Sequence, residues 1–505
     1  MPLTMPIEPA DEYNATLAAN VHPADWRNPT PDGPYDLVVL GAGTAGLVSA
    51  AGAAGLGARV ALIERHLLGG DCLNVGCVPS KCIIRSGRMA AEARRAADYG
   101  VRAAGVEADF PAVMERMRRI RSRISAHDSA ARFRDLGVDV YLGNGHFIGP
   151  DAVAVNGAKL TFHRAVIATG ARAVRPPVEG LEAAGYLTNE TVFSLTERPR
   201  RLAVFGSGPL GCELAQVFRR LGCDVWIIER GGHILSHEDD DAAKIVAASF
   251  QRDGVNVVVA AYIRRASVAA GGKVLHLMAD GREMTLTVDE FLVGAGRAPN
   301  VEGLNLESAG VEYDARDGVH VSDHLRTANP RIYAAGDICL RHKFTHTADA
   351  TARMVIQNAL FGGRKKLSAL TVPWCTYTDP EIAHVGLYER DAKERGIAIE
   401  TFARRFEDVD RAICDGEEDG LIKIHVRQGT DKIVGATIVA RHAGEMISEI
   451  TLAMVGRIGL KRLSGVIHPY PTQAEAVRQV ADAYNRTRLT PFAKRALKTW
   501  LSLRR

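Results

Sequence analysis

The sequence predicts an α/β fold in which two Rossmann-like dinucleotide-binding domains are followed by a smaller α+β domain. Two βαβ patterns with the same glycine spacing occur in one chain, and each is flanked by apolar runs. From about residue 367 apolar runs such as GLIKIHVR and KIVGATIVA alternate without a glycine motif. A chain of 505 residues that is 47% hydrophobic and 24% charged is long and apolar enough to give each domain a core.

The first pattern, YDLVVLGAGTAGLVSAAGAAGLGARVALIER, forms a complete dinucleotide-binding unit. Gly41, Gly43 and Gly46 have the GxGxxG spacing between an apolar run and a helical pattern, and Glu64 ends the second apolar run. The first glycine allows the turn, the second admits a pyrophosphate to the backbone, and the third lets helix and strand pack closely. Glu64 is expected to accept a hydrogen bond from a ribose hydroxyl.

The second pattern, RLAVFGSGPLGCELAQVFRRLGCDVWIIER, repeats this unit with Gly206, Gly208, Gly211 and Glu229. In both, the acidic residue lies 23 positions after the first glycine, from 41 to 64 and from 206 to 229. Two units predict two dinucleotides, a tightly held FAD and an exchangeable nicotinamide. Glu229 favours a free ribose hydroxyl and therefore NADH, although Arg230 could accommodate the phosphate of NADPH.

Further apolar runs end in residues suited to a cofactor. AVIATGARAVRPP is expected to be a strand that ends at Thr169 and Gly170 and leads out of the first domain, and FLVGAGRAPN resembles a return strand. RIYAAGDIC is a third strand, after which Asp337 could meet the ribityl chain of a flavin. Asp337 could also serve as the N-cap of the helix predicted in THTADATARMVIQNALF.

The stretch GGDCLNVGCVPSK holds Cys72 and Cys77, two of the eight cysteines. A disulfide across so short a loop would add little stability, and zinc would need further ligands that are not nearby. The pair is therefore predicted to be redox-active, with Gly76 giving the backbone freedom to close the loop. A helix that begins near Pro79 would favour a thiolate at its N-terminus.

Lys81 and Glu213 are predicted to form an ion pair beside the flavin. Lys81 lies one turn after Cys77, and Glu213 is a carboxylate in the middle of the otherwise apolar helical pattern PLGCELAQVF. A carboxylate in such surroundings requires a cation.

From about residue 35 to 485 the chain resembles the flavin-dependent pyridine nucleotide-disulfide oxidoreductases, which include dihydrolipoamide dehydrogenase, glutathione reductase and mercuric reductase. The resemblance rests on GxGxxG with Glu64, CLNVGCVPSK, ATG at 168–170, GSGPLGCE, GAGRAPN and AAGD. It implies that Cys77 is the flavin-facing thiolate and Cys72 the thiol that attacks the acceptor. It also implies a homodimer in which each active site is completed by the partner's interface domain.

Motifs and resemblance together divide the chain into six predicted segments. These are an irregular N-terminal arm at 1–34, the first part of the FAD-binding domain at 35–175, the NAD(P)-binding domain at 176–293, the return part of the FAD-binding domain at 294–366, the interface or dimerisation domain at 367–485, and a basic amphipathic tail at 486–505.

The electron acceptor is suggested by the stretch HPYPTQAE. Where disulfide-reducing members of the family have a histidine acid/base, this chain has Tyr470, followed by Glu475; His468 is an alternative, displaced base. The chain resembles mercuric reductases at this position, since they also have a tyrosine where this chain has Tyr470. Tyr186 matches a second tyrosine of mercuric reductases. Hg(II), bound transiently by Cys72 and Cys77 and reduced to Hg(0), is the favoured acceptor. Delivery by a C-terminal cysteine pair is not expected, because LKTWLSLRR contains no cysteine.

Other acceptors and roles stay open. A low-molecular-weight disulfide, a quinone, another metal ion such as Cu(II), a dihydrolipoamide dehydrogenase-like activity and a non-catalytic redox sensor are the alternatives. A net charge of +4 with dispersed basic residues argues against a nucleic-acid partner. The start MPLTMPIEPADEYN does not resemble a secretory signal, so a cytoplasmic location is expected. The tail is expected either to dock on its own dimer or to contact an anionic membrane surface.

Overall fold

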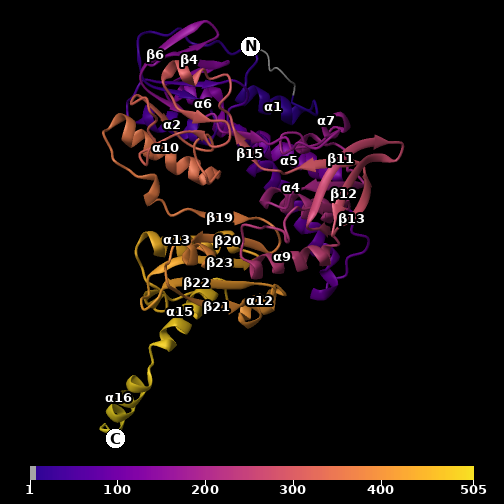
Figure 1. Cartoon of the computed structure of the whole chain (residues 1–505), viewed down its shortest axis with the longest axis vertical. Helices are drawn as coiled ribbons and strands as arrows, with labels where there is room; N and C mark the ends of the chain where they lie inside the picture. The colour runs from indigo at the N-terminus through magenta and orange to yellow at the C-terminus, as the bar shows by residue number, and fades with distance from the viewer. Residues whose placement is uncertain (1–6, 505) are drawn as a thin grey trace. The chain divides into compact units, whose positions relative to one another are not determined.

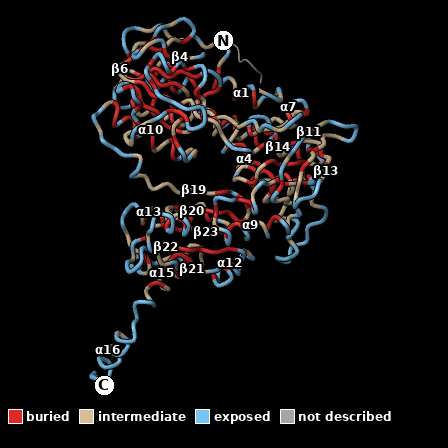
Figure 2. Tube along the Cα trace, in the orientation of Figure 1, coloured by how far each residue is buried: buried red, intermediate tan, exposed pale blue. Residues whose placement is uncertain are grey.

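The computed structural model describes residues 7–504, which form two compact units (Figure 1). The first unit comprises Met1–Arg230 and Val257–Leu370, and the second comprises Gly231–Asn256 and Thr371–Arg505. Each unit has its own buried core (Figure 2).

The first glycine motif lies in a mixed sheet with the order β3-β2-β1-β6-β5-β4, in which β18 also pairs with β6. Its parallel strands are β1 (Tyr35–Leu40), β2 (Val60–Glu64), β3 (Val138–Leu142), β6 (Ala158–Ile167) and β18 (Ile332–Ala334). Both faces of these strands are buried, which explains their almost continuous apolar sequence. Helix α2 (Thr44–Gly55) follows β1, and α10 (Thr345–Leu360) packs against α2.

The second glycine motif lies in a separate sheet with the order β10-β9-β8-β14, in which β9, β8 and β14 run parallel. It contains β8 (Arg201–Phe205), β9 (Asp224–Ile228), β10 (Asn256–Val258) and β14 (Glu290–Val293), with α8 (Pro209–Arg220) connecting β8 to β9. An antiparallel sheet of β11 (Ala261–Ala269), β12 (Gly272–Ala279) and β13 (Arg282–Val288) follows β10 in the chain.

The predicted return strand divides into two short strands. Its first residues belong to β14, which pairs with β8 of the second glycine-motif sheet. Its last residues form β15 (Arg297–Pro299), which pairs antiparallel with β7 (Ala171–Ala173). The outgoing and returning chains therefore run side by side, and the return strand predicted at 291–300 is present as the two strands β14 and β15.

The prediction of an irregular N-terminal arm was wrong. Residues Glu12–Val21 form α1, which begins at Asp11, whose carboxylate accepts a hydrogen bond from the Asn14 amide. Leu17 and Val21 are buried in the core of the first unit. Proline and polar residues before the helix obscure this short amphipathic pattern, in which the buried residues Asn14, Leu17 and Val21 lie three and four positions apart.

The second unit is built on an antiparallel sheet with the order β19-β20-β23-β22-β21. Its strands are β19 (Pro373–Thr376), β20 (Glu381–Gly386), β21 (Ile399–Arg405), β22 (Leu421–Arg427) and β23 (Ile433–Ala440). Helices α13 (Ala443–Val455) and α15 (Glu475–Thr487) contribute to its core. This is the α+β domain that the alternating apolar runs predict.

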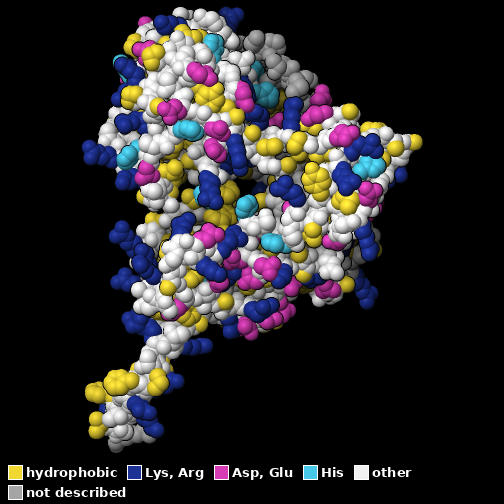
Figure 3. Space-filling model, viewed as in Figure 1, with side chains coloured by type: hydrophobic (Ala, Val, Ile, Leu, Met, Phe, Trp, Pro, Cys, Tyr) yellow, Lys and Arg dark blue, Asp and Glu magenta, His cyan; other side chains and the backbone are white. Residues whose placement is uncertain are grey.

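The tail forms α16 (Pro491–Ser502), in which no residue is buried. Phe492, Leu497 and Trp500 are exposed, and apolar side chains gather at this end of the chain (Figure 3). Within residues 7–504 no helix combines the length and apolar character needed to cross a membrane.

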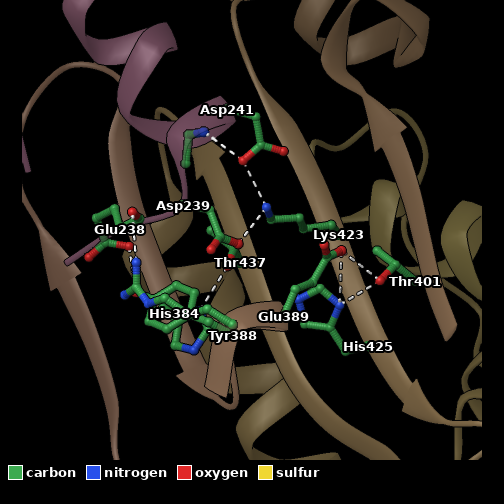
Figure 4. Close-up of polar contacts among 12 residues, drawn as sticks. Glu238, Asp239, Asp241, His384, Tyr388, Glu389, Thr401, Lys423, His425 and Thr437 are labelled. Atoms are coloured by element: carbon green, nitrogen blue, oxygen red, sulfur yellow. Dashed lines mark hydrogen bonds and ion pairs between the residues drawn. The ribbon is translucent and has the colours of Figure 1, made fainter. Parts of the chain in front are cut away.

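Helix α9 (Asp240–Asp253) follows the second glycine motif in sequence but groups with the second unit. A buried cation on β22 joins it to the sheet (Figure 4). Lys423 Nζ lies 2.5 Å from Asp239 Oδ2 and 2.7 Å from Asp241 Oδ1, and only 7% of the lysine side chain is exposed. Burial lowers the pKa of Lys423, but the two carboxylates outweigh burial and raise it.

We expect Lys423→Met to destabilise the second unit by about 3 kcal/mol, because it leaves the largely buried Asp239 carboxylate without its cation. Urea unfolding of the full chain, followed by tryptophan fluorescence and circular dichroism, measures this loss. Lys244→Met is the matched control, since Lys244 pairs with Asp240 on the same helix but both side chains are exposed. Equal midpoints for the two variants would contradict a stabilising role of the buried pair.

Candidate functional site

Two consecutive helices place the cysteine pair. Cys72 lies in α3 (Gly70–Asn74), and Cys77 is the first residue of α4 (Cys77–Arg94), which begins two residues before Pro79. The chain turns between them at Val75 and Gly76. A Cβ on Gly76 would lie 2.7 Å from the Asp71 carbonyl oxygen, so only glycine fits this turn.

The pair is electrostatically unequal. A hydrogen bond from the Cys72 thiol, helped by Thr345 and Lys81, lowers the pKa of Cys77 to about 6 despite burial. The same hydrogen bond, followed by burial, raises the pKa of Cys72. These shifts favour the thiolate form of Cys77 and the protonated form of Cys72. The Thr345 hydroxyl, at the start of α10, lies 3.3 Å from Cys77 Sγ.

The predicted ion pair between Lys81 and Glu213 is present. Lys81 Nζ lies 2.7 Å from Glu213 Oε2 and joins α4 to α8, and Glu213 is buried. A cavity of about 400 Å³ opens beside it and is lined by Cys77, Val78, Lys81, Cys82, Arg85, Arg116 and Ile124.

Both glycine motifs leave a helix N-terminus open to an anion. Gly43 and Gly208 are the N-cap residues of α2 and α8, and neither helix has a side-chain cap. Gly41 and Gly206 take positive φ values of 99° and 92°, which the tight turn before each helix requires. These uncapped amides fit the phosphates of a dinucleotide.

The acidic residues of the motifs brace the glycine turns. Glu64 accepts a hydrogen bond from the Ala42 amide at 2.7 Å, and Glu229 accepts from the Ser207 amide at 2.9 Å. Ala42 and Ser207 each follow the first glycine of their motif, so the two copies share one arrangement. Arg230, next to Glu229, is exposed.

Asp337 lies after the carboxyl end of β18, where a flavin ribityl chain is predicted. Its Oδ2 is 3.6 Å from Arg297 Nε, and burial raises its pKa while Arg297 opposes that shift. The alternative role as an N-cap was wrong, because α10 begins at Thr345 with Phe344 as its N-cap residue. Its role as an acceptor for a flavin hydroxyl stays a prediction.

Thr169 and Gly170 lie where the chain leaves the first sheet. The Thr169 hydroxyl donates to the Asn300 carbonyl at 2.9 Å and so ties the outgoing segment to the returning one. Gly170 has a φ of 68°.

The residues predicted from HPYPTQAE lie in the second unit. The exposed Tyr470 donates a hydrogen bond to Asp410 at 2.8 Å, which raises the pKa of Tyr470. Glu475 is buried and pairs with Arg478. His468 Nε2 lies 3.0 Å from Glu449 Oε1, so its imidazole is held against α13.

Tyr186 is not brought to the thiols by any contact found among residues 7–504. Its hydroxyl donates to Glu182 at 2.9 Å, and it lines a separate cavity of about 650 Å³ with Arg172, Arg175 and Glu190.

Three contacts that hold the turn between Cys72 and Cys77 were not predicted from the sequence. Asn189 Nδ2 donates to the Val75 carbonyl, Arg297 pairs with Asp71, and Arg121 donates to the Asn74 carbonyl. They lie far from the cysteines in sequence, and no local pattern indicates them.

We expect iodoacetamide to alkylate Cys77 of the reduced protein at half its maximal rate near pH 6, because only the thiolate reacts. The rate falls as the pH drops below this value. Lys81→Met should raise the midpoint by removing a positive charge, whereas Lys81→Arg should preserve it. A wild-type midpoint near the ordinary value of about 8.5 would contradict the thiolate assignment.

Comparisons with known proteins agree with these motifs. A family model described as pyridine nucleotide-disulphide oxidoreductase matches residues 35–359, and the dimerisation-domain model of the same family matches residues 372–481. The predicted fold class is thereby confirmed.

Three similar proteins illustrate the range of the match. A mercuric reductase of Staphylococcus aureus is 34% identical over 455 residues, covering 90% of this chain and 83% of the relative. A dihydrolipoyl dehydrogenase of Bacillus subtilis (strain 168) is 30% identical over 462 residues, covering 88% and 97%. The solved Cu(II) complex of the HOCl-induced flavoprotein disulfide reductase RclA from Escherichia coli has a TM-score of 0.79 and 26% identity, covering 88% of this chain and 98% of that one.

Family models and relatives thus cover both the nucleotide-binding motifs and the α+β domain. The chain belongs to the pyridine nucleotide-disulphide oxidoreductase family, whose members use FAD and NAD(P)H.

Proposed function

We propose that this chain reduces Hg(II) to Hg(0) at Cys72 and Cys77, with NADH as the electron donor and FAD as the resident cofactor. The overall reaction balances as NADH plus Hg(II) giving NAD⁺, H⁺ and Hg(0). Two thiolates are ligands that a soft metal ion prefers. Cys77 supplies one at neutral pH, and Cys72 supplies the second when the ion displaces its proton.

The observation that carries this proposal is the side chain at position 470. Reduction of a disulfide needs an acid that protonates the leaving thiolate. The Tyr470 hydroxyl instead donates a hydrogen bond to Asp410, and the imidazole of His468 is held against α13 by Glu449. A metal ion that leaves as the neutral element needs no such proton, so these arrangements disfavour disulfides more than metal ions.

The relatives support this proposal and one alternative. A mercuric reductase at 34% identity is the stronger argument. The Cu(II) complex of RclA supports Cu(II) as a second acceptor, which the same thiol pair could bind.

The chain's own residues would hold the cofactors through the two glycine motifs. FAD would be held by Gly41, Gly43, Gly46, Glu64, Thr169, Gly170 and Asp337, and the nicotinamide nucleotide by Gly206, Gly208, Gly211, Glu229 and Arg230. Bound FAD supplies the two-electron chemistry between nicotinamide and thiols. Lys81, fixed by Glu213, keeps a positive charge beside Cys77 and so favours its thiolate.

We further propose a cytoplasmic homodimer. The matched dimerisation domain supports the dimer, in which Tyr470 and Glu475 would complete the partner's site. Tyr186 would take part in binding the metal ion only if its loop moved, since its hydroxyl donates a hydrogen bond to Glu182. The exposed face of α16 would dock on this dimer or on an anionic membrane surface.

We expect the purified flavoprotein to oxidise NADH in the presence of Hg(II) and excess thiol. Cys77→Ser should lower this turnover by about two orders of magnitude or more, because the charged ligand is lost. Oxidised glutathione, lipoamide and a quinone serve as competing acceptors. Absence of Hg(II) turnover, or its survival in Cys77→Ser, would overturn the proposal.

Tyr470→His separates metal from disulfide chemistry. The variant should gain activity toward oxidised glutathione or lipoamide, because an imidazole can protonate a leaving thiol. Tyr470→Phe is the control, since it removes the hydroxyl without adding a base. If the wild type already prefers lipoamide, the dihydrolipoamide dehydrogenase-like alternative is correct.

We expect kcat/KM to favour NADH over NADPH by about tenfold or more, because the Glu229 carboxylate would repel a 2′-phosphate. Glu229→Gln should narrow this ratio while keeping an acceptor for the Ser207 amide. Arg230→Met should lower kcat/KM for NADPH and leave kcat/KM for NADH unchanged. A wild-type preference for NADPH would show that Arg230, and not Glu229, governs selection.

A further inference from the structure

The N-terminal helix α1 lies outside the matched family region and contacts the segment that carries the cysteines. The Val21 carbonyl, at its end, accepts a hydrogen bond from the Leu68 amide just before α3. At its start, Asp11 Oδ2 pairs with Arg118 Nε at 2.5 Å on α5 (Phe110–Ser125). Both ends of α1 are therefore anchored in the first unit.

Arg121 on α5 connects α1 to the cysteine turn. Its Nη2 donates to Asn14 Oδ1 and its Nη1 donates to the Asn74 carbonyl, both at 2.7 Å. Asn14, Asn74 and Arg121 are all buried, with at most 4% of each residue exposed. Burial lowers the pKa of Arg121 to about 10, so its guanidinium stays charged at neutral pH.

The accepting carbonyl lies between the two cysteines. Asn74 is the last residue of α3, and its side chain is itself fixed by hydrogen bonds to the Leu68 and Gly70 carbonyls at 3.0 and 2.9 Å. A charged donor inside the protein makes one of the stronger hydrogen bonds available to a carbonyl. Its position therefore restrains the backbone that joins Cys72 to Cys77.

We propose that α1, acting through Asn14 and Arg121, positions the Cys72 to Cys77 turn and thereby sets the reactivity of the thiol pair. Arg121 and Asn14 are positioning residues, since their side-chain hydrogen bonds within residues 7–504 run to each other and to backbone carbonyls, that of Asn74 among them, and not to the sulfur of Cys72 or Cys77. The inference rests on the proposed redox role of the two cysteines.

Loosening the turn has a defined chemical consequence. The hydrogen bond from Cys72 is the largest cause of the lowered pKa of Cys77. If the turn gains freedom, this hydrogen bond weakens and less Cys77 is a thiolate at a given pH. The same freedom changes how readily the two sulfurs meet in a disulfide.

The test compares Asn14→Ala with Thr16→Ala in the full-length flavoprotein. Asn14→Ala removes the acceptor of Arg121, whereas Thr16 is an exposed residue of the same helix. In the reduced protein, mass spectrometry follows iodoacetamide alkylation of Cys77 against pH. We expect the rate at pH 6 to fall about twofold or more in Asn14→Ala and to stay unchanged in Thr16→Ala.

A second readout is the equilibrium between dithiol and disulfide in a thiol redox buffer. We expect its constant to change by about threefold or more in Asn14→Ala. Arg121→Lys, which keeps the charge but lacks the two-pronged guanidinium, should show the same changes and decides the case if Asn14→Ala does not fold. A merely structural role would lower the melting temperature and leave both readouts unchanged.

Neither readout uses Hg(II), so the two proposals can fail separately. If Cys72 and Cys77 form no disulfide in any redox buffer, the proposed function fails. If they form one, but folded Asn14→Ala or Arg121→Lys matches Thr16→Ala in both readouts, the positioning role of α1 is overturned.

Discussion

The unequal electrostatic environments of the Cys72 and Cys77 thiols decide the chemical character of the site. The Cys72 thiol, together with Thr345 and Lys81, lowers the pKa of Cys77, and Cys77 in turn raises the pKa of Cys72. This inequality depends on the turn that holds the two cysteines next to each other. Gly76 permits that shape, because any side chain there would collide with the Asp71 carbonyl. Much of the surrounding structure can be understood as support for this turn.

The two glycine motifs give the chain a second recurring constraint. In each one a carboxylate from the following strand accepts a hydrogen bond from the amide after the first glycine. This contact holds the turn and keeps the helix N-terminus open to phosphate. Glu64 and Glu229 are already held in place by these backbone hydrogen bonds. Each carboxylate could therefore accept a second hydrogen bond, from a ribose hydroxyl, without first being reoriented.

The sequence predicts the features that depend on local patterns. The glycine spacings, the cysteine stretch and the alternating runs after residue 367 each lie within a short segment, and the family match agrees with all three. The pairing of Lys81 with Glu213 could be predicted because a carboxylate in an apolar helix needs a cation. The contacts of Arg121, Arg297 and Asn189 could not, because they join residues that are distant in sequence. The helix at Glu12–Val21 was missed since only tertiary packing reveals which of its residues are buried.

Helix α1 also changes where the folded unit begins. The matched family region starts at residue 35, yet Leu17 and Val21 are buried in the same core as the first parallel sheet. A chain shortened to the family boundary would expose this patch and leave the buried Arg121 without its asparagine acceptor. Homology alone would therefore set the N-terminal limit of the domain too late, and a recombinant protein made to that limit would differ from the full chain at its thiols.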